Sequence, residues 1–165
     1  MGKERHELDG QTSEVRPSTL VLGVGNILLS DEGVGVHVIE ALKSRSMPPD
    51  VEVLDGGTAS LELLNIMANR DKVIVVDAVE GGGEPGTIYS FTPDDIKYHS
   101  VTFTSLHQIS LLETLTDAKY LGIAPRAVII LGIEPKKMDL GLEMTQEVAA
   151  TLPRVIELVL AELEA

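Results

Sequence analysis

Short runs of β-branched and aliphatic residues recur along this chain and alternate with stretches in which apolar residues return every three or four positions. The short runs are typical of buried strands, and the periodic stretches are typical of helices that pack on a sheet. The strand-like runs are residues 19–23, 51–54, 73–77, 87–91 and 127–132. Their alternation with helical stretches predicts an α/β fold in which helices cover both faces of the sheet.

The run at 87–91 is expected to be oriented differently from the others. It follows the run at 73–77 after only AVEGGGEPG, which is too short to hold a crossover helix. The strand should therefore be antiparallel to its neighbour, and the sheet should be mixed. The simplest interpretation of EGGGEPG is a flexible hairpin loop.

Three helices have clear signals at their ends. Residues 32 to about 44 keep a helical apolar period, and Ser30 or Asp31 can cap the first turn. The sequence SLHQ at 105–108 has the form of a capping box, which predicts the start of a second helix. The last helical stripe runs toward the C-terminus, and Pro153 should kink or divide it.

Length and composition predict one domain over residues 18–165. The 165 residues suffice for one sizeable core, whereas residues 1–17 have almost no apolar content and are expected to be a disordered extension. The net charge of −13 disfavours nucleic acid and membrane surfaces as partners. We find no long apolar stretch and no signal peptide, so we expect a cytoplasmic protein.

Candidate chemistry gathers where the parallel strands are expected to end, because ligands of open α/β sheets bind beyond the carboxyl ends of the strands. An acidic pair, Asp31 and Glu32, follows the first strand, and Asp77 closes the third. An acid directly after buried residues costs desolvation unless it has a partner. The second strand is followed by a turn that we expect to handle substrate, made of Asp55, Gly56, Gly57 and Thr58.

His107 adds an imidazole to these carboxylates. In the first turn of its helix, the helix dipole disfavours an imidazolium, so the ring should stay neutral with a lone pair free. The chain has no cysteine, so a metal would be held by oxygen and imidazole groups, a set suited to zinc, nickel or manganese. The spacing alone does not establish that these groups converge.

Each of these residues also has an ordinary structural interpretation. Asp77 can be a turn former, Glu32 can complement a helix dipole, and His107 can be a polar first-turn residue. The turn at 55–58 can be an ordinary turn with Thr58 as a helix N-cap.

The glycine-rich segment GVGNILLSDEGVGV, residues 23–36, resembles a nucleotide loop at first sight. Leu28 occupies the third glycine position of a dinucleotide fingerprint. The segment also offers two carboxylates, which repel phosphate. We therefore interpret it as a loop that presents Glu32 to a metal rather than as a phosphate cradle.

Five blocks of the sequence together resemble the hydrogenase maturation endopeptidases, and within them the uptake-hydrogenase type. The blocks are VLGVGNILLSDEGVGVHVIEAL, LDGGTASLELL, VDAVEGGGEPGTI, SLHQISL and LGIEPK. They occur in the family's order from about Leu20 to the end of the chain. Proteins of this family remove the C-terminal peptide from the large subunit of nickel-iron hydrogenases.

The resemblance implies a single-domain, three-layer sandwich with a mostly parallel five-stranded twisted sheet. It also implies that Glu32, Asp77 and His107 bind a metal. These residues match the family's Glu in GN-x-x-x-x-D-E, its Asp at the end of the third strand and its His in S-x-H. The nickel would be supplied by the precursor of the hydrogenase large subunit, so no tightly bound cofactor of the protein's own is expected. No residue is identified as a nucleophile or general base.

Two features depart from the family pattern, and two other functions stay open. Ser60 stands where the family's GGT-x-G loop has glycine, and the extension before Thr19 is longer than expected. A non-catalytic nickel carrier or chaperone would use the same three ligands. A nucleotide-binding α/β enzyme is the third hypothesis, which Leu28 and the loop acids disfavour.

Overall fold

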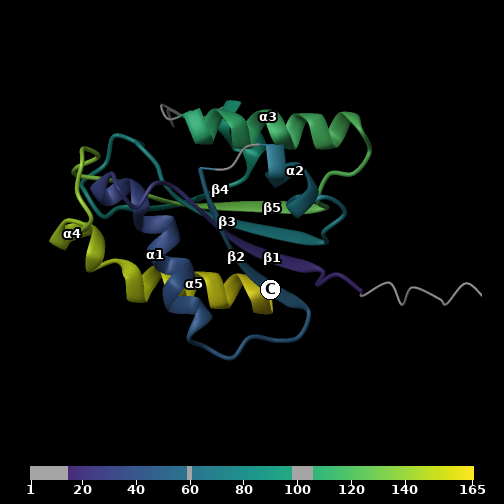
Figure 1. Cartoon of the computed structure of the whole chain (residues 1–165), viewed down its shortest axis with the longest axis horizontal. Helices are drawn as coiled ribbons and strands as arrows, with labels where there is room; N and C mark the ends of the chain where they lie inside the picture. Colours follow the sequence, from purple (N-terminus) through teal and green to yellow (C-terminus); the bar gives the residue numbers. More distant parts are fainter. Residues whose placement is uncertain (1–14, 59–60, 98–105) are drawn as a thin grey trace, which may run out of the picture.

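The structure is a computed structural model that describes residues 15–58, 61–97 and 106–165, except the side chains of Leu61, Lys97, Leu106 and His107. Within these ranges one five-stranded sheet lies between helices (Figure 1). The strand order is β2-β1-β3-β5-β4, and every pairing is parallel except that of β4 with β5. The strands are β1 (Thr19–Val24), β2 (Val51–Gly57), β3 (Lys72–Ala78), β4 (Ile88–Phe91) and β5 (Ala127–Ile133). The predicted fold class is confirmed.

The antiparallel orientation of β4 is confirmed, but the hairpin interpretation of EGGGEPG is wrong. The partner of β4 is β5, with Tyr89 opposite Gly132, and β5 lies between β3 and β4. β5 has buried residues along its second half, whereas β4 is a short strand at the edge of the sheet. The longer, more apolar strand thus takes the inner position, and residues 79–87 cross over its end.

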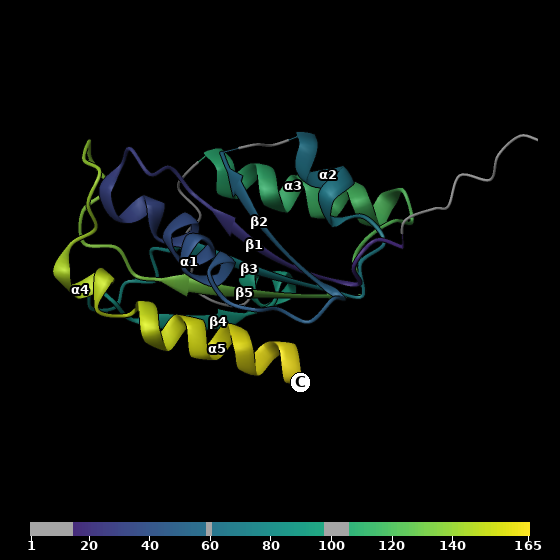
Figure 2. The same cartoon turned by 60° about the horizontal axis from the view of Figure 1, so that its bottom comes forward.

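Helices cover both faces, as predicted. α1 (Val34–Lys43) and α5 (Leu152–Glu164) pack on one face, and α2 (Leu61–Met67) and α3 (Leu106–Tyr120) pack on the other (Figure 2). Alternate residues of β3 point to the two layers: Ile74 joins the first core and Val75 the second. The remaining short helices are η1 (Ser30–Gly33), η2 (Pro93–Lys97) and α4 (Gln146–Ala149).

The start of the first helix differs from the prediction, whereas the division of the last helical stripe agrees with it. The first helix begins as the 3-10 turn η1, and α1 then starts at Val34 without a side-chain cap. Ser30 and Asp31 therefore do not cap α1, and their side chains bond elsewhere. The predicted division of the last helical stripe is confirmed, because α4 and α5 are separate helices and Pro153 lies in the first turn of α5. Ser105 of the predicted capping box lies outside the described residues.

None of the helices in the described ranges has both the length and the hydropathy of a membrane-spanning segment.

The chain just before β1 is tied to the sheet by a buried arginine. Arg70 is almost fully buried, and its guanidinium donates to the carbonyl oxygens of Pro17 (2.6 Å) and Ile66 (3.0 Å) and pairs with Glu52. A guanidinium is buried at lower cost when carbonyl and carboxylate acceptors satisfy its donors. Residues 1–14 of the predicted extension lie outside the described residues.

We predict that deleting residues 2–14 leaves the melting temperature unchanged, because those residues lack the apolar side chains needed to dock. A protein that begins at Ser18 should have a lower melting temperature, because the buried Arg70 loses the carbonyl oxygen of Pro17 as an acceptor, at a cost of about 1–3 kcal/mol. Thermal unfolding of the two truncated proteins measures both effects. A large loss from the shorter deletion would contradict the prediction.

Candidate functional site

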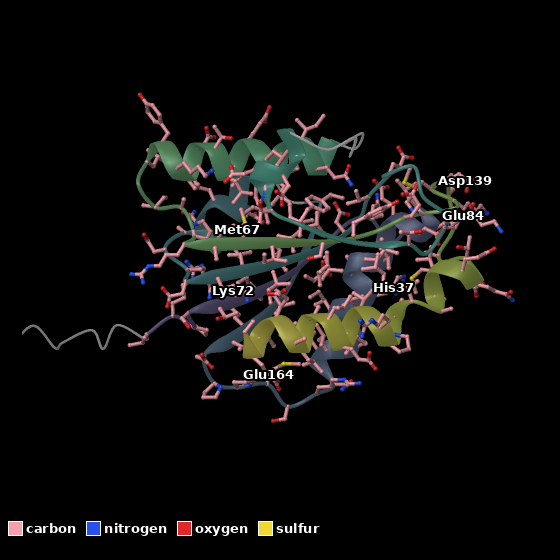
Figure 3. The ribbon with its side chains drawn as sticks, turned by 180° about the vertical axis from the view of Figure 1, so that it is seen from behind. His37, Met67, Lys72, Glu84, Asp139 and Glu164 are labelled. Carbon is pink, nitrogen blue, oxygen red and sulfur yellow. The ribbon has the colours of Figure 1, made fainter. Side chains whose placement is uncertain are left out.

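The carboxyl ends of β1, β2, β3 and β5 meet at one edge of the sheet, which lies opposite the N-terminal end of the described chain (Figure 1). The loops after these strands gather there. In Figure 3, Glu84 and Asp139 extend from this end of the molecule, whereas Lys72, the first residue of β3, lies toward the other end. We call this end the site edge.

Glu32 is held at the site edge by glycines that allow very close packing. A Cβ on Gly35 would overlap the carbonyl oxygens of Val24 and Val76, so the first turn of α1 lies directly on the ends of β1 and β3. A Cβ on Gly25 would likewise overlap the carbonyl oxygen of Glu32. The glycines of the 23–36 segment therefore serve the packing of loop and helix against strands. Glu32 is buried in η1, two residues before the start of α1.

Asp77 lies one residue after Val76, near the end of β3, and only 1% of its surface is exposed. Its Oδ1 accepts a hydrogen bond from the backbone N–H of Ala78 at 2.8 Å. Asp77 is also in register with Gly132 of β5, which has no side chain to cover it. An ionisable group so deeply buried is costly and needs a compensating partner.

The first turn of α3 is joined to the same strand end. The side-chain amide of Gln108 is buried and donates to the carbonyl oxygen of Ala78. This bond brings the residue after His107 to the residue after Asp77. His107 itself is in the helix, but its side chain lies outside the described residues.

The backbone thus brings η1, the end of β3 and the start of α3 to one edge of the sheet. Among the described side chains, no three acidic or histidine groups lie close enough to form a metal site. The predicted set of Glu32, Asp77 and His107 includes a side chain that is not described, so the metal site stays a prediction.

Asp31 is a correction to the expectation that the loop presents two carboxylates. It is fully buried, and its carboxylate is occupied by the chain's own donors. The backbone N–H groups of Lys136 and Lys137 both donate to Oδ2 at 2.9 Å. Thr145 donates its backbone N–H to Oδ1 at 2.7 Å and its hydroxyl to both oxygens, at 3.1 and 2.9 Å.

These hydrogen bonds also decide the charge of Asp31. Burial acts to raise its pKa, but the backbone donors of Lys137, Thr145 and Lys136 and the Thr145 hydroxyl together outweigh it and hold the pKa below its ordinary value. The carboxylate is therefore ionised at neutral pH and stabilises the segment 136–145 against η1.

We predict that Asp31→Asn lowers the free energy of unfolding at pH 7 by about 2–4 kcal/mol, because an amide group would face backbone donors in a buried network. The folded pKa is depressed, so the stabilisation is full above the unfolded value near 3.9 and is lost as the pH falls through the folded value. The difference from the parent protein should therefore shrink between pH 7 and pH 3.

Urea unfolding at the two pH values measures this difference. Asp94→Asn is the matched control, because Asp94 is exposed and its partner is the exposed Lys119. An equal loss of stability at both pH values would contradict an ionised Asp31.

The predicted substrate turn at 55–58 is mostly part of β2. Asp55 is exposed, its Oδ1 accepts the N–H of Gly57 at 2.7 Å, and Gly57 has a positive φ of 49°. Gly56 is buried, and a Cβ there would press on the side chain of Leu22. Thr58 is the last described residue before α2, and residues 59–60 lie outside the described residues, so its interpretation as N-cap stays a prediction.

Glu134 and Tyr89 organise the site edge but were not among the predicted residues. The buried Glu134 accepts the N–H of Gly81 at 2.6 Å and the hydroxyl of Tyr89 at 2.7 Å. The Tyr89 oxygen in turn accepts the N–H of Gly83 at 3.0 Å. Burial and the neighbouring Glu134 carboxylate raise the pKa of Tyr89, which keeps its proton for this bond. An acid directly after the buried run AVIILGI is the same signal that pointed to Asp77.

Comparisons with known proteins agree with this architecture. The family model described as hydrogenase maturation protease matches residues 36–162. The hydrogenase 2 maturation protease of Escherichia coli is 41% identical over 146 residues, covering 87% of this chain and 89% of that protein.

Two solved structures are similar over most of the chain. The hydrogenase maturating endopeptidase HybD of Escherichia coli has a TM-score of 0.81 and 39% identity, covering 88% of this chain and 91% of that one. The [NiFe] hydrogenase maturation protease HycI of Thermococcus kodakarensis has a TM-score of 0.73 and 25% identity, covering 92% and 96%.

Proposed function

The chain belongs to the hydrogenase maturation protease family, and on that premise we propose that it removes the C-terminal peptide from the nickel-loaded precursor of a nickel-iron hydrogenase large subunit. Glu32, Asp77 and His107 recognise the nickel carried by that precursor. The observation that carries this proposal is the bond from Gln108 to Ala78, which joins the first turn of α3 to the strand end that holds Asp77.

The chemistry of the three groups suits a metal that arrives with its substrate. Two carboxylates and an imidazole form an oxygen and nitrogen donor set that accepts nickel. Each group comes from a different element of the fold: η1, β3 or α3. Such a set completes the coordination of an ion that the precursor already holds, without removing it from the precursor.

Selectivity then follows as a difference of affinities. Donation from the three groups contributes binding free energy only when the precursor carries nickel. A precursor without nickel presents the same peptide but lacks that contribution. The protease therefore distinguishes the two forms without a separate regulatory domain.

We predict that the protein cuts nickel-loaded precursor and leaves nickel-free precursor intact. His107→Ala should slow the reaction by at least about a hundredfold, since even changes around metal ligands cost roughly 10- to 100-fold. Its melting temperature should stay near that of the parent, because a first-turn position contributes little to the core. Intact-mass measurement after incubation follows the release of the C-terminal peptide.

Glu113→Ala is the matched control, because Glu113 is exposed further along the same helix. Two results would overturn the proposal: equal cleavage of both precursor forms, or a requirement for a tightly bound zinc ion in the protease itself, which would indicate a metal-activated water.

We also propose that the turn at 55–58 handles the precursor tail. Asp55 is exposed on β2 and paired in register with Gly23 of β1, beside the glycine-rich segment that leads to Glu32. Its carboxylate can meet a basic residue of the tail, while Gly56 and Gly57 allow the tight backbone path of the turn, with a positive φ at Gly57.

We predict that Asp55→Asn impairs cleavage but leaves cadmium binding near normal, because the substitution removes a charge from the substrate contact and not from the metal ligands. Cadmium titration and the cleavage assay measure the two effects separately. Asp50→Asn serves as control, since Asp50 is exposed just before the other end of β2. Loss of cadmium binding in Asp55→Asn would instead make Asp55 a ligand.

A further inference from the structure

Four large apolar side chains are exposed beside the site edge. Ile27 and Leu28 lie in the loop that leads to η1, and Leu140 and Leu142 lie in the loop after β5. Leu140 is 81% exposed and Leu142 is 69% exposed. We call these four residues the apolar patch. Clusters of exposed apolar side chains mark surfaces that another molecule covers.

The two loops of the patch are bonded to each other along their backbones. The carbonyl oxygen of Leu28 accepts the N–H of Gly141 at 2.9 Å, and the carbonyl oxygen of Gly141 accepts the N–H of Ser30 at 2.8 Å. Asp31 fastens the same loop at both of its ends, at Lys136 and Thr145. The patch is therefore held in one conformation before a partner binds, which lowers the entropy cost of binding.

Charge near the patch is balanced locally, although the chain carries a net charge of −13. Lys136 pairs with Glu147, and Lys137 pairs with Asp139 at 3.6 Å. Because these charges are paired, they repel neither an acidic nor a basic partner. The apolar side chains of the patch then determine the contact.

We propose that the apolar patch binds the folded body of the hydrogenase large-subunit precursor, next to the point where its C-terminal tail enters the site edge. This inference rests on the proposed function. Residues 27 and 28 belong to the same short loop that carries Glu32, so a folded protein whose tail reaches Glu32 lies against the patch.

Two other occupants are disfavoured, the extended tail by the backbone pairing and a second copy of this chain by its position. An extended tail is usually held by main-chain hydrogen bonds, but the groups of Leu28, Ser30 and Gly141 named above already bond to one another. A second copy of this chain on the patch would cover the edge that carries Glu32 and block access of the substrate. A preformed apolar surface of the substrate fits both constraints.

The test replaces Leu140 and Leu142 together by serine and compares the kinetics with those of Leu121→Ser. Leu121 is a matched control because it is 59% exposed, and it follows the end of α3, near the start of β3 and away from the site edge. The double variant should raise KM for nickel-loaded precursor about tenfold or more, since burial of even one leucine contributes roughly that factor. Its kcat should stay within about twofold, because no group of the reaction has changed.

A second measurement identifies the occupant. Mature large subunit, which lacks the tail, should compete with the precursor for the parent protease and compete about tenfold more weakly for the double variant. Absence of competition would assign the patch to the tail and overturn the inference. Two other results would also overturn the inference. One is a dimer of the parent protein in sedimentation that is absent for the double variant, and the other is an unchanged KM of the double variant while the parent protein cuts normally. Failure of the parent protein to cut loaded precursor would instead overturn the proposed function.

Discussion

The buried carboxylate of Asp31 is the interaction on which the site edge depends. It gathers donors from Lys136, Lys137 and Thr145, and so ties the loop after β5 to the 3-10 turn after β1. A buried charge is stable only when such donors are complete. Because the bonds hold η1 in place, they also fix the neighbouring Glu32 and the exposed apolar loops around it.

Two adjacent acids therefore have different tasks. Asp31 is fully buried and hydrogen-bonded to the loop after β5, whereas Glu32 lies in η1 with its backbone packed closely on Gly25, after the end of β1. Close packing at Gly35 makes this arrangement possible, since any side chain there would push α1 away from both strands. Rigid elements thus position the groups that we propose to meet a metal-bearing substrate.

Much of the fold could be predicted from the sequence because apolar runs and helical periods are local signals. The predicted strands agree with the observed strand bounds to within a few residues. The division near Pro153 could be predicted because a proline interrupts a helix at its own position. The partner of β4 could not be predicted, since it depends on which strand takes the inner position. The separate roles of Asp31 and Glu32 could not be predicted from the sequence either, because the donors to Asp31 lie more than a hundred positions away along the chain. The resemblance indicated Glu32, Asp77 and His107 together, which spacing alone could not do.

The most direct measurement of the central claim is a crystal structure of the full chain soaked with cadmium or zinc as a substitute for the nickel of the precursor. The account predicts one ion at the site edge, within about 2.0 to 2.5 Å of side-chain atoms of Glu32, Asp77 and His107. An ion bound elsewhere, or an empty site edge at high metal concentration, would contradict it.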